Sequence, residues 1–197
     1  MSDQLDPDAV DHPIGTLLGG RSIILVGMMG AGKSSIGRRL ASRLQVPFVD
    51  ADTEIETAAN QKISDIFEQF GEDYFRQGEK RVIARLLEQG PQVLATGGGA
   101  FMDADTRQAA RDHGISVWID APIELLMNRV RRRNDRPLLK TADPAATMQG
   151  LLDLRNPVYA EADIRVQSRD VPHTEIVDEM LEAIDSHLRE RAVELRK

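Results

Sequence analysis

Cysteine is absent from the 197-residue sequence, so the chain has neither a disulfide framework nor a thiolate zinc site. No apolar run has the length of a membrane span, and none has the form of a secretory signal. The histidines are scattered without the spacing of metal ligands: His12, His113, His173 and His187. These absences lead us to expect a cytoplasmic protein without a membrane partner or a structural metal site.

An excess of positive charge is also lacking. Lys and Arg total 25 against 32 Asp and Glu, and the net charge is −7. A surface with this negative net charge repels the phosphates of nucleic acid, and we expect no nucleic-acid partner. Any anion site must be built locally from a few basic residues.

The first 20 residues are acidic, rich in turn-forming residues and without hydrophobic period, which predicts a flexible leader over residues 1–20. Residues 21–197 contain no repeat and no linker, so we expect one domain there. Within it, helical patterns alternate with five short apolar runs: SIILVG, VPFVD, QVLATGGG, ISVWID and ADIRVQ. This alternation predicts a three-layer α/β/α fold around a five-stranded parallel sheet. The last helix should bury one stripe, made of Ile176, Val177, Met180, Leu181, Ile184 and Leu188.

The stretch GMMGAGKSS, Gly27–Ser35, satisfies the pattern GxxxxGK[ST] between a predicted strand and a predicted helix. Glycines let successive N–H groups turn toward phosphate oxygens, and the helix N-terminus adds partial positive charge. Lys33 should reach the β and γ phosphates, and Ser34 should bind Mg²⁺. The expected nucleotide contacts are Gly30, Ala31, Gly32, Lys33, Ser34 and Ser35.

A phosphate loop indicates a nucleotide but not a reaction. The guanine-reading stretch NKxD of switch GTPases is missing, and the length disfavours large ATPases. We therefore expect a small-molecule kinase.

The acceptor side of such a kinase is indicated by FVDADTEIE, which ends the second predicted strand with Asp50 and Asp52. If the stretch is extended, both side chains point the same way, and they can orient a magnesium-bound water and accept a hydroxyl hydrogen bond. The alternative is helix capping by Asp52 or Thr53, and Thr53 to Glu56 fits a capping box. Three consecutive glycines, residues 97–99, follow the third strand and indicate close approach of backbone to a ligand.

Arginines provide planar, permanently charged forks for carboxylates and phosphates. The segment MNRVRRRNDRPLLK is rich in arginine without apolar period, which predicts a mobile lid over about residues 130–145 that excludes water from the phosphates. A solvated helix end is the alternative for Arg131 and Arg133. We favour a functional role for Arg136 and Arg155. Arg76 lies in GEDYFRQGE, beside Tyr74 and Phe75.

In this order, GMMGAGKSSIGRRLA, FVDADTEIE, DIFEQFGEDYFRQGE, TGGGA, RPLL and RNPVY resemble the shikimate kinase family of nucleoside monophosphate kinase-like phosphate-loop enzymes. The resemblance covers about residues 22–190. It implies a monomer that transfers the γ-phosphoryl of ATP, with Mg²⁺, to the 3-hydroxyl of shikimate in aromatic amino-acid biosynthesis. Ser35 stands where threonine is common in the family, and Met28 where phenylalanine is common.

The resemblance also implies roles for residues on the acceptor side. Asp52 would bind the ring hydroxyls and act as the base, while Asp50 would lie near Mg²⁺. Arg76 and Arg155 would bind the substrate carboxylate, and Gly98 and Gly99 would contact the ring. Phe67 and Phe75 would lie beside the acceptor pocket.

On the donor side, Arg136 would reach from the lid between the phosphates and the acceptor, and Arg129 would pack on adenine. The resulting catalytic set is Lys33, Asp52 and Arg136.

Other functions stay open at this point. A kinase for another small acid such as gluconate also needs arginine forks, although the acids and RNPVY favour shikimate. A regulatory module that binds ATP without turnover is the alternative from another class. The acidic leader could in addition recruit a neighbouring enzyme.

Overall fold

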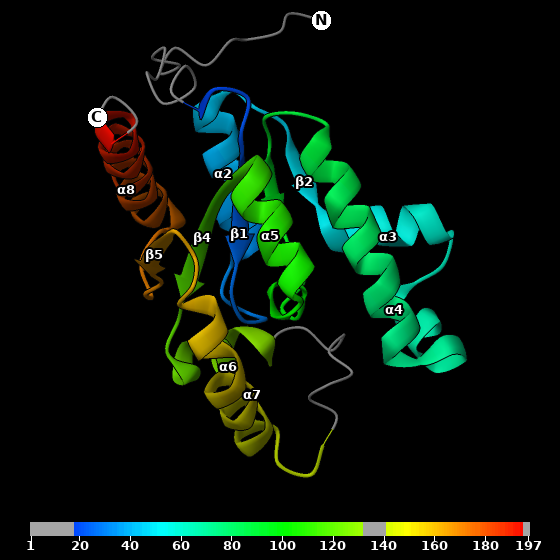
Figure 1. Cartoon of the computed structure of the whole chain (residues 1–197). Helices are drawn as coiled ribbons and strands as arrows, with labels where there is room; N and C mark the ends of the chain where they lie inside the picture. Colours follow the sequence, from blue (N-terminus) through cyan, green and yellow to red (C-terminus); the bar gives the residue numbers. More distant parts are fainter. Residues whose placement is uncertain (1–17, 132–140, 195–197) are drawn as a thin grey trace, which may run out of the picture.

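The computed structural model describes residues 18–131 and 141–194, and it contains a parallel five-stranded sheet with helices on both faces (Figure 1). The strands are β1 (Ser22–Val26), β2 (Phe48–Asp50), β3 (Val93–Ala95), β4 (Gly114–Asp120) and β5 (Ile164–Gln167). Their order across the sheet is β2-β3-β1-β4-β5, and every neighbouring pair is parallel. The predicted fold class and all five predicted strands are confirmed.

The helices are α2 (Lys33–Leu44), α3 (Ala51–Ala59), α4 (Ile63–Glu88), α5 (Ala104–His113), α6 (Ile123–Val130), α7 (Pro144–Tyr159) and α8 (His173–Glu194), with a 3-10 turn η1 (Ala100–Met102). Helix α2 packs against α8, and α4 packs against α5. All six residues of the predicted apolar stripe on α8 are at most 4% exposed. Helix α4 bends at Gly71, whose φ of 82° interrupts the helical backbone.

The core surrounds the central strands. Every residue of β1, β3 and β4 is buried, as expected for parallel strands that helices cover on both faces. Leu18 is also buried in this core. The leader was predicted over residues 1–20, but Leu18 belongs to the core, so the leader stays a prediction only for residues 1–17, which lie outside the described residues.

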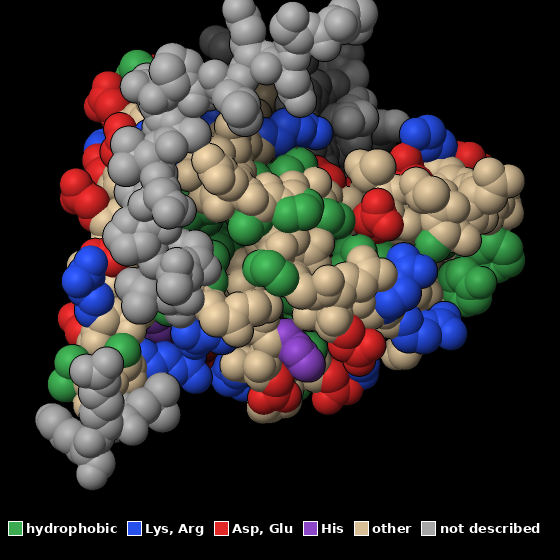
Figure 2. Space-filling view, turned by 90° about the horizontal axis from the view of Figure 1, so that it is seen from above, with side chains coloured by type: hydrophobic (Ala, Val, Ile, Leu, Met, Phe, Trp, Pro, Cys, Tyr) green, Lys and Arg blue, Asp and Glu red, His purple; other side chains and the backbone are tan. Residues whose placement is uncertain are grey.

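Because all strands run in the same direction, their carboxyl ends meet at one edge of the sheet, at the bottom of Figure 1. The segments that follow β1, β2 and β3 therefore lie close together there. Figure 2 shows the opposite end of the molecule, where acidic and basic side chains both surround a central group of hydrophobic ones. In the described part of the chain, no helix is long and apolar enough to cross a membrane.

Candidate active site

The loop between β1 and α2 has the backbone of an anion site. Gly27, Gly30 and Gly32 have φ values of 131°, 84° and 103°, which side chains rarely allow. A Cβ on Gly27 would lie 2.6 Å from the carbonyl oxygen of Ile119. Gly32 is the N-cap of α2 and provides no side-chain hydrogen bond, so the helix end is open to an anionic ligand.

The Lys33 ammonium lies over this loop. Its Nζ donates to the carbonyl oxygens of Gly27 and Met28 at 2.7 and 2.9 Å. The side chain is buried, with an exposed residue fraction of 9%. The charge is thus held beside the N–H groups that would face phosphates.

Ser34 and Asp50 touch each other. The Ser34 hydroxyl donates to Asp50 Oδ2 at 2.7 Å, while Asp50 Oδ1 accepts from the backbone N–H of Asp52 at 3.2 Å. Asp50 is therefore the N-cap of α3, and the chain is already helical at Asp52. This differs from the extended geometry that we considered, and the cap is neither Asp52 nor Thr53, because β2 ends at Asp50 and α3 begins at Ala51.

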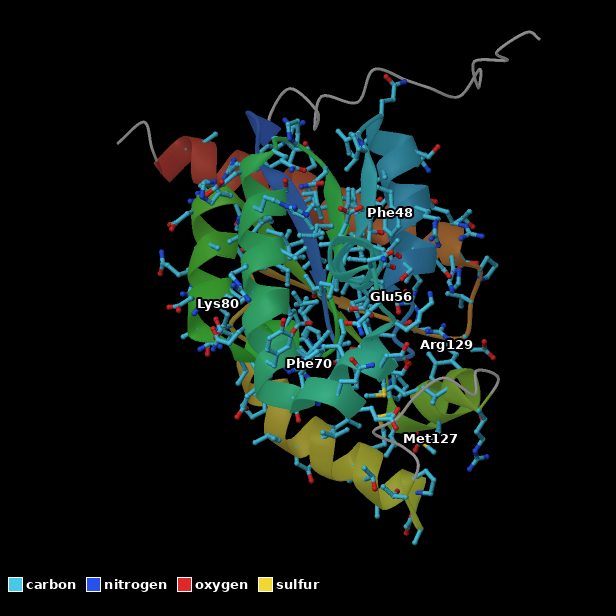
Figure 3. All side chains as sticks on the ribbon, turned by 90° about the vertical axis from the view of Figure 1, so that its right-hand side faces the viewer. Phe48, Glu56, Phe70, Lys80, Met127 and Arg129 are labelled. Carbon is cyan, nitrogen blue, oxygen red and sulfur yellow. The ribbon has the colours of Figure 1, made fainter. Side chains whose placement is uncertain are left out.

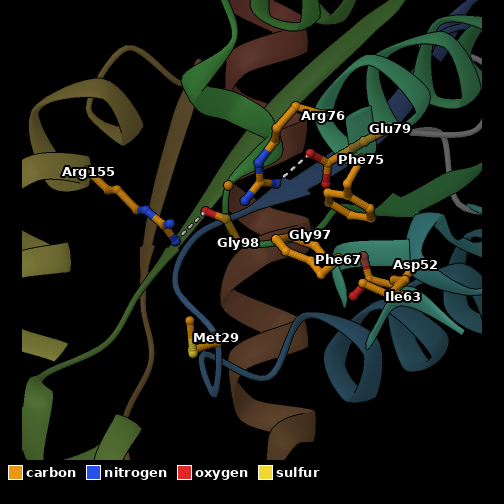
Figure 4. A pocket seen from close by; sticks show the side chains of 11 residues that line it. Met29, Asp52, Ile63, Phe67, Phe75, Arg76, Glu79, Gly97, Gly98 and Arg155 are labelled. Atoms are coloured by element: carbon orange, nitrogen blue, oxygen red, sulfur yellow. Dashed lines mark hydrogen bonds and ion pairs between the residues drawn. The ribbon is translucent and has the colours of Figure 1, made fainter. Parts of the chain in front are cut away.

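A pocket of about 130 Å³ opens beside the phosphate loop (Figure 4). It brings together the predicted acceptor residues from four segments: Asp52 from α3, Arg76 from α4, the glycines after β3, and Arg155 from α7. Met29, a member of the phosphate loop, also lines it. An apolar wall completes the pocket, formed by Met29, Ile63, Phe67 and Phe75.

Arg76 is held in place by two acids on its own helix. Its Nη2 donates to Glu72 Oε1 at 3.0 Å, and its Nη1 donates to Glu79 Oε2 at 2.6 Å. The guanidinium also lies over the Phe75 ring, 5.1 Å from the centroid. A Cβ on Gly99 would lie 2.6 Å from Arg76 Nη2, so the glycine leaves room for the guanidinium.

Glu79 is a pocket residue that the sequence did not single out. It is 2% exposed, and its Oε1 has no hydrogen-bond partner among the described residues. Burial raises the pKa of this carboxyl, and the charge of Arg76 offsets only part of that effect. Its sequence signals are its place at the end of DIFEQFGEDYFRQGE and its position three residues after Arg76. Such pairs are also common on solvated helix faces.

Arg155 lies on the other side of the pocket and is 7% exposed. Its Nη1 donates to the carbonyl oxygen of Gly98 at 3.2 Å and to Met28 Sδ at 3.9 Å. The hydroxyl of Tyr159, a second residue that the sequence did not single out, donates to the same Gly98 oxygen. The arginine thus contacts both the glycine segment and the phosphate loop.

Arg129, labelled in Figure 3, belongs to α6 and contacts both the phosphate loop and the segment that follows β5. It donates to the carbonyl oxygens of Ala31 and Arg169 at 3.1 and 3.2 Å and to Ser168 Oγ at 3.1 Å. Burial lowers the pKa of its guanidinium.

The lid is largely outside the described residues, which include neither Arg133 nor Arg136. The role of Arg136 and the lid over about residues 130–145 stay predictions. Arg131 is exposed at the C-cap of α6, which agrees with the alternative of a solvated helix end.

Comparison with known proteins adds independent findings. A family model described as shikimate kinase matches residues 29–185. The chain is 58% identical to a shikimate kinase of Bradyrhizobium diazoefficiens over 185 residues, which cover 94% of this chain and 88% of the relative. Its structure is similar to that of a shikimate kinase from Acinetobacter baumannii in complex with shikimate, with a TM-score of 0.84, 37% identity, and coverage of 88% and 98% of the two chains.

A gluconokinase from Sinorhizobium meliloti is also similar in structure, with a TM-score of 0.62 and coverage of 89% of this chain and 97% of that one. The two chains are 20% identical, so this similarity concerns the fold alone.

Proposed function

The chain belongs to the shikimate kinase family, and from this premise we propose that it transfers the γ-phosphoryl group of ATP to the 3-hydroxyl of shikimate. One observation carries the proposal: an acid and two arginines, Asp52, Arg76 and Arg155, line one pocket that directly adjoins the phosphate loop. A donor site and an acceptor site are thereby adjacent, as phosphoryl transfer requires.

The pocket suits a small cyclic acid that carries hydroxyl groups. Arg76 and Arg155 supply guanidinium forks for a carboxylate. Phe67 and Phe75, whose ring centroids are 4.7 Å apart, offer an apolar surface to a ring. Asp52 supplies an acceptor for a hydroxyl proton.

The residues at Ser34 and Asp50 fit Mg²⁺. Their oxygens are hard ligands in contact at 2.7 Å beside the phosphate loop. Mg²⁺ commonly takes only one or two protein ligands and completes its shell with phosphates and water. When bound, Mg²⁺ supplies charge neutralisation on the phosphates.

We assign the transfer step to the following groups. Asp52 orients the 3-hydroxyl and takes its proton, while the hydroxyl oxygen forms a bond to the γ phosphorus. The bond between that phosphorus and the β–γ bridging oxygen breaks, and ADP leaves. Lys33 and the open N-terminus of α2 stabilise the charge on the phosphates.

A coupled assay of ADP release tests the proposal. ATP and Mg²⁺ are supplied with shikimate, with gluconate or with no acceptor. We expect shikimate-dependent ADP release, with a Lys33→Ala variant as the inactive control. ADP release with gluconate but not with shikimate would indicate a kinase for gluconate. ATP binding without ADP release in any of the three assays would indicate a regulatory module that binds ATP without turnover.

We also propose a monomer as the oligomeric state. Light scattering on the purified protein tests it, and a dimer mass would contradict it.

A further inference from the structure

Two side chains of α7 converge on one carbonyl group. Arg155 and Tyr159 lie four residues apart, which places them on the same face of the helix. The Arg155 Nη1 donates to Gly98 O at 3.2 Å, and the Tyr159 hydroxyl donates to the same oxygen. A carbonyl oxygen has two lone pairs, so these two donors fill its capacity.

Gly98 lies at the junction between the two halves of the site. A Cβ built on it would be 3.4 Å from the backbone nitrogen of Met29, 3.7 Å from the carbonyl oxygen of Gly27 and 3.6 Å from Arg155 Nη1. The first two atoms belong to the phosphate loop, and the third belongs to the acceptor pocket. Gly98 therefore lies close to both halves of the site, and its carbonyl oxygen is the atom that Arg155 contacts.

Tyr159 is itself firmly held and has no access to a substrate. It is 1% exposed, and its ring lies beside Trp118 with centroids 6.0 Å apart. Tyr159 is absent from the described residues that line the pocket. Its hydroxyl is a neutral donor at ordinary pH, and burial raises its pKa further, to about 12.

We infer that Tyr159 is a positioning residue: its hydroxyl fixes the Gly98 carbonyl, and through that carbonyl it fixes the Arg155 guanidinium that binds the acceptor carboxylate. This inference rests on the proposed function. The residue acts through Gly98 and Arg155 and does not touch the reacting atoms. Its loss should therefore weaken acceptor binding in the ground state and the transition state alike, which raises KM and leaves kcat nearly unchanged.

The test is Tyr159→Phe, which removes the hydroxyl and keeps the ring against Trp118. We expect the KM for shikimate to rise about 3- to 10-fold, the loss that one neutral hydrogen bond produces. The KM for ATP should stay within about 2-fold of the parent value, since the phosphate loop keeps its own contacts. The matched control is Tyr74→Phe, because Tyr74 is the only other tyrosine and is 55% exposed; it should leave both KM values unchanged.

A double variant separates positioning from a merely structural role. In an Arg155→Lys background, Tyr159→Phe should change the KM for shikimate by less than about 2-fold, because the guanidinium that it positions is gone. A structural role would instead lower Tm and raise both KM values together, and that result would overturn the inference. An unchanged KM for shikimate in the single variant would also overturn it.

Measurements on the parent protein distinguish failure of the positioning role from failure of the proposed function. If it turns over shikimate and Tyr159→Phe behaves like Tyr74→Phe, the positioning role fails and the proposed function stands. If calorimetry detects no shikimate binding to the parent and no ADP is released, the proposed function fails and the positioning role fails with it.

Discussion

Asp52 and Glu79 approach the same point in the pocket from two different helices. A Cβ built on Gly97 would lie 3.0 Å from Asp52 Oδ1 and 2.7 Å from Glu79 Oε1. Helices α3 and α4 therefore bring their carboxylates to the glycine segment that follows β3. Only a residue without a side chain fits between them.

Gly97→Ala should accordingly damage the site more than the fold. Its backbone conformation is open to other residues, but the added methyl group must displace one of the two carboxylates. A displacement on the order of 1 Å at a reacting group costs about 100-fold in rate, and we expect kcat/KM for shikimate to fall by about that factor. Gly150→Ala is the control: a Cβ there meets no atom within 4 Å, and helix propensity should stabilise α7 by about 0.5–1 kcal/mol. Steady-state kinetics and Tm check both, and full activity of Gly97→Ala would contradict the assigned geometry.

Asp52→Asn tests the base. The amide keeps the size of the side chain but takes no proton, and general-base catalysis is worth about 10²- to 10⁴-fold in kcat. We expect a loss in that range with the KM for ATP nearly unchanged. Asp112→Asn, an exposed aspartate on α5, should behave like the parent. Equal turnover by Asp52→Asn and the parent would remove Asp52 from the mechanism.

Asp50 has two separable functions, which two substitutions distinguish. Asp50→Asn keeps an N-cap for α3 but removes the negative charge beside Ser34. We expect Tm to change little and the Mg²⁺ concentration for half-maximal activity to rise about 10-fold. Asp50→Ala should additionally lose about 1 kcal/mol of stability with the cap. A magnesium titration of ADP release measures the effect, and superimposable titrations of Asp50→Asn and the parent would argue against a magnesium role.

Local patterns explain why so much of the fold could be predicted from the sequence. Buried parallel strands need continuous apolar runs, and the phosphate loop has a fixed spacing of glycine and lysine. The start of α3 was not predicted: Asp52 or Thr53 was considered as the cap, whereas Asp50 is the cap, because β2 ends at Asp50. Such boundaries depend on tertiary contacts rather than on propensity.

Glu79 and Tyr159 were not predicted because their roles depend on distant segments. Tyr159 donates to a carbonyl oxygen 61 residues earlier in the chain. Glu79 belongs to the pocket only because α4 packs over the turn that follows β3. Both residues end stretches that carry the family resemblance, DIFEQFGEDYFRQGE and RNPVY, but these stretches alone do not indicate what either side chain contacts.

The buried Glu79 carboxyl should make stability depend on pH in a defined direction. Burial raises its folded-state pKa above the ordinary value of 4.5, so between these two values the folded protein binds the proton more tightly than the unfolded chain. The Glu79 carboxyl therefore contributes stability at pH values below its unfolded-state pKa. This contribution is lost as pH rises through its folded-state pKa. Glu79→Gln is neutral at every pH, so its free energy of unfolding should increase relative to the parent as pH rises from about 4 to about 8.

Urea unfolding of both proteins across this range measures the difference. Replacing Glu79 also removes an ion pair with Arg76, so the absolute stabilities differ and the slope with pH is the informative quantity. Glu72→Gln removes the other acid that binds Arg76 but retains Glu79, and it should keep the slope of the parent. Parallel curves for Glu79→Gln and the parent would mean that Arg76 fully compensates the burial of this carboxyl, so that its pKa is the same in the folded and unfolded states.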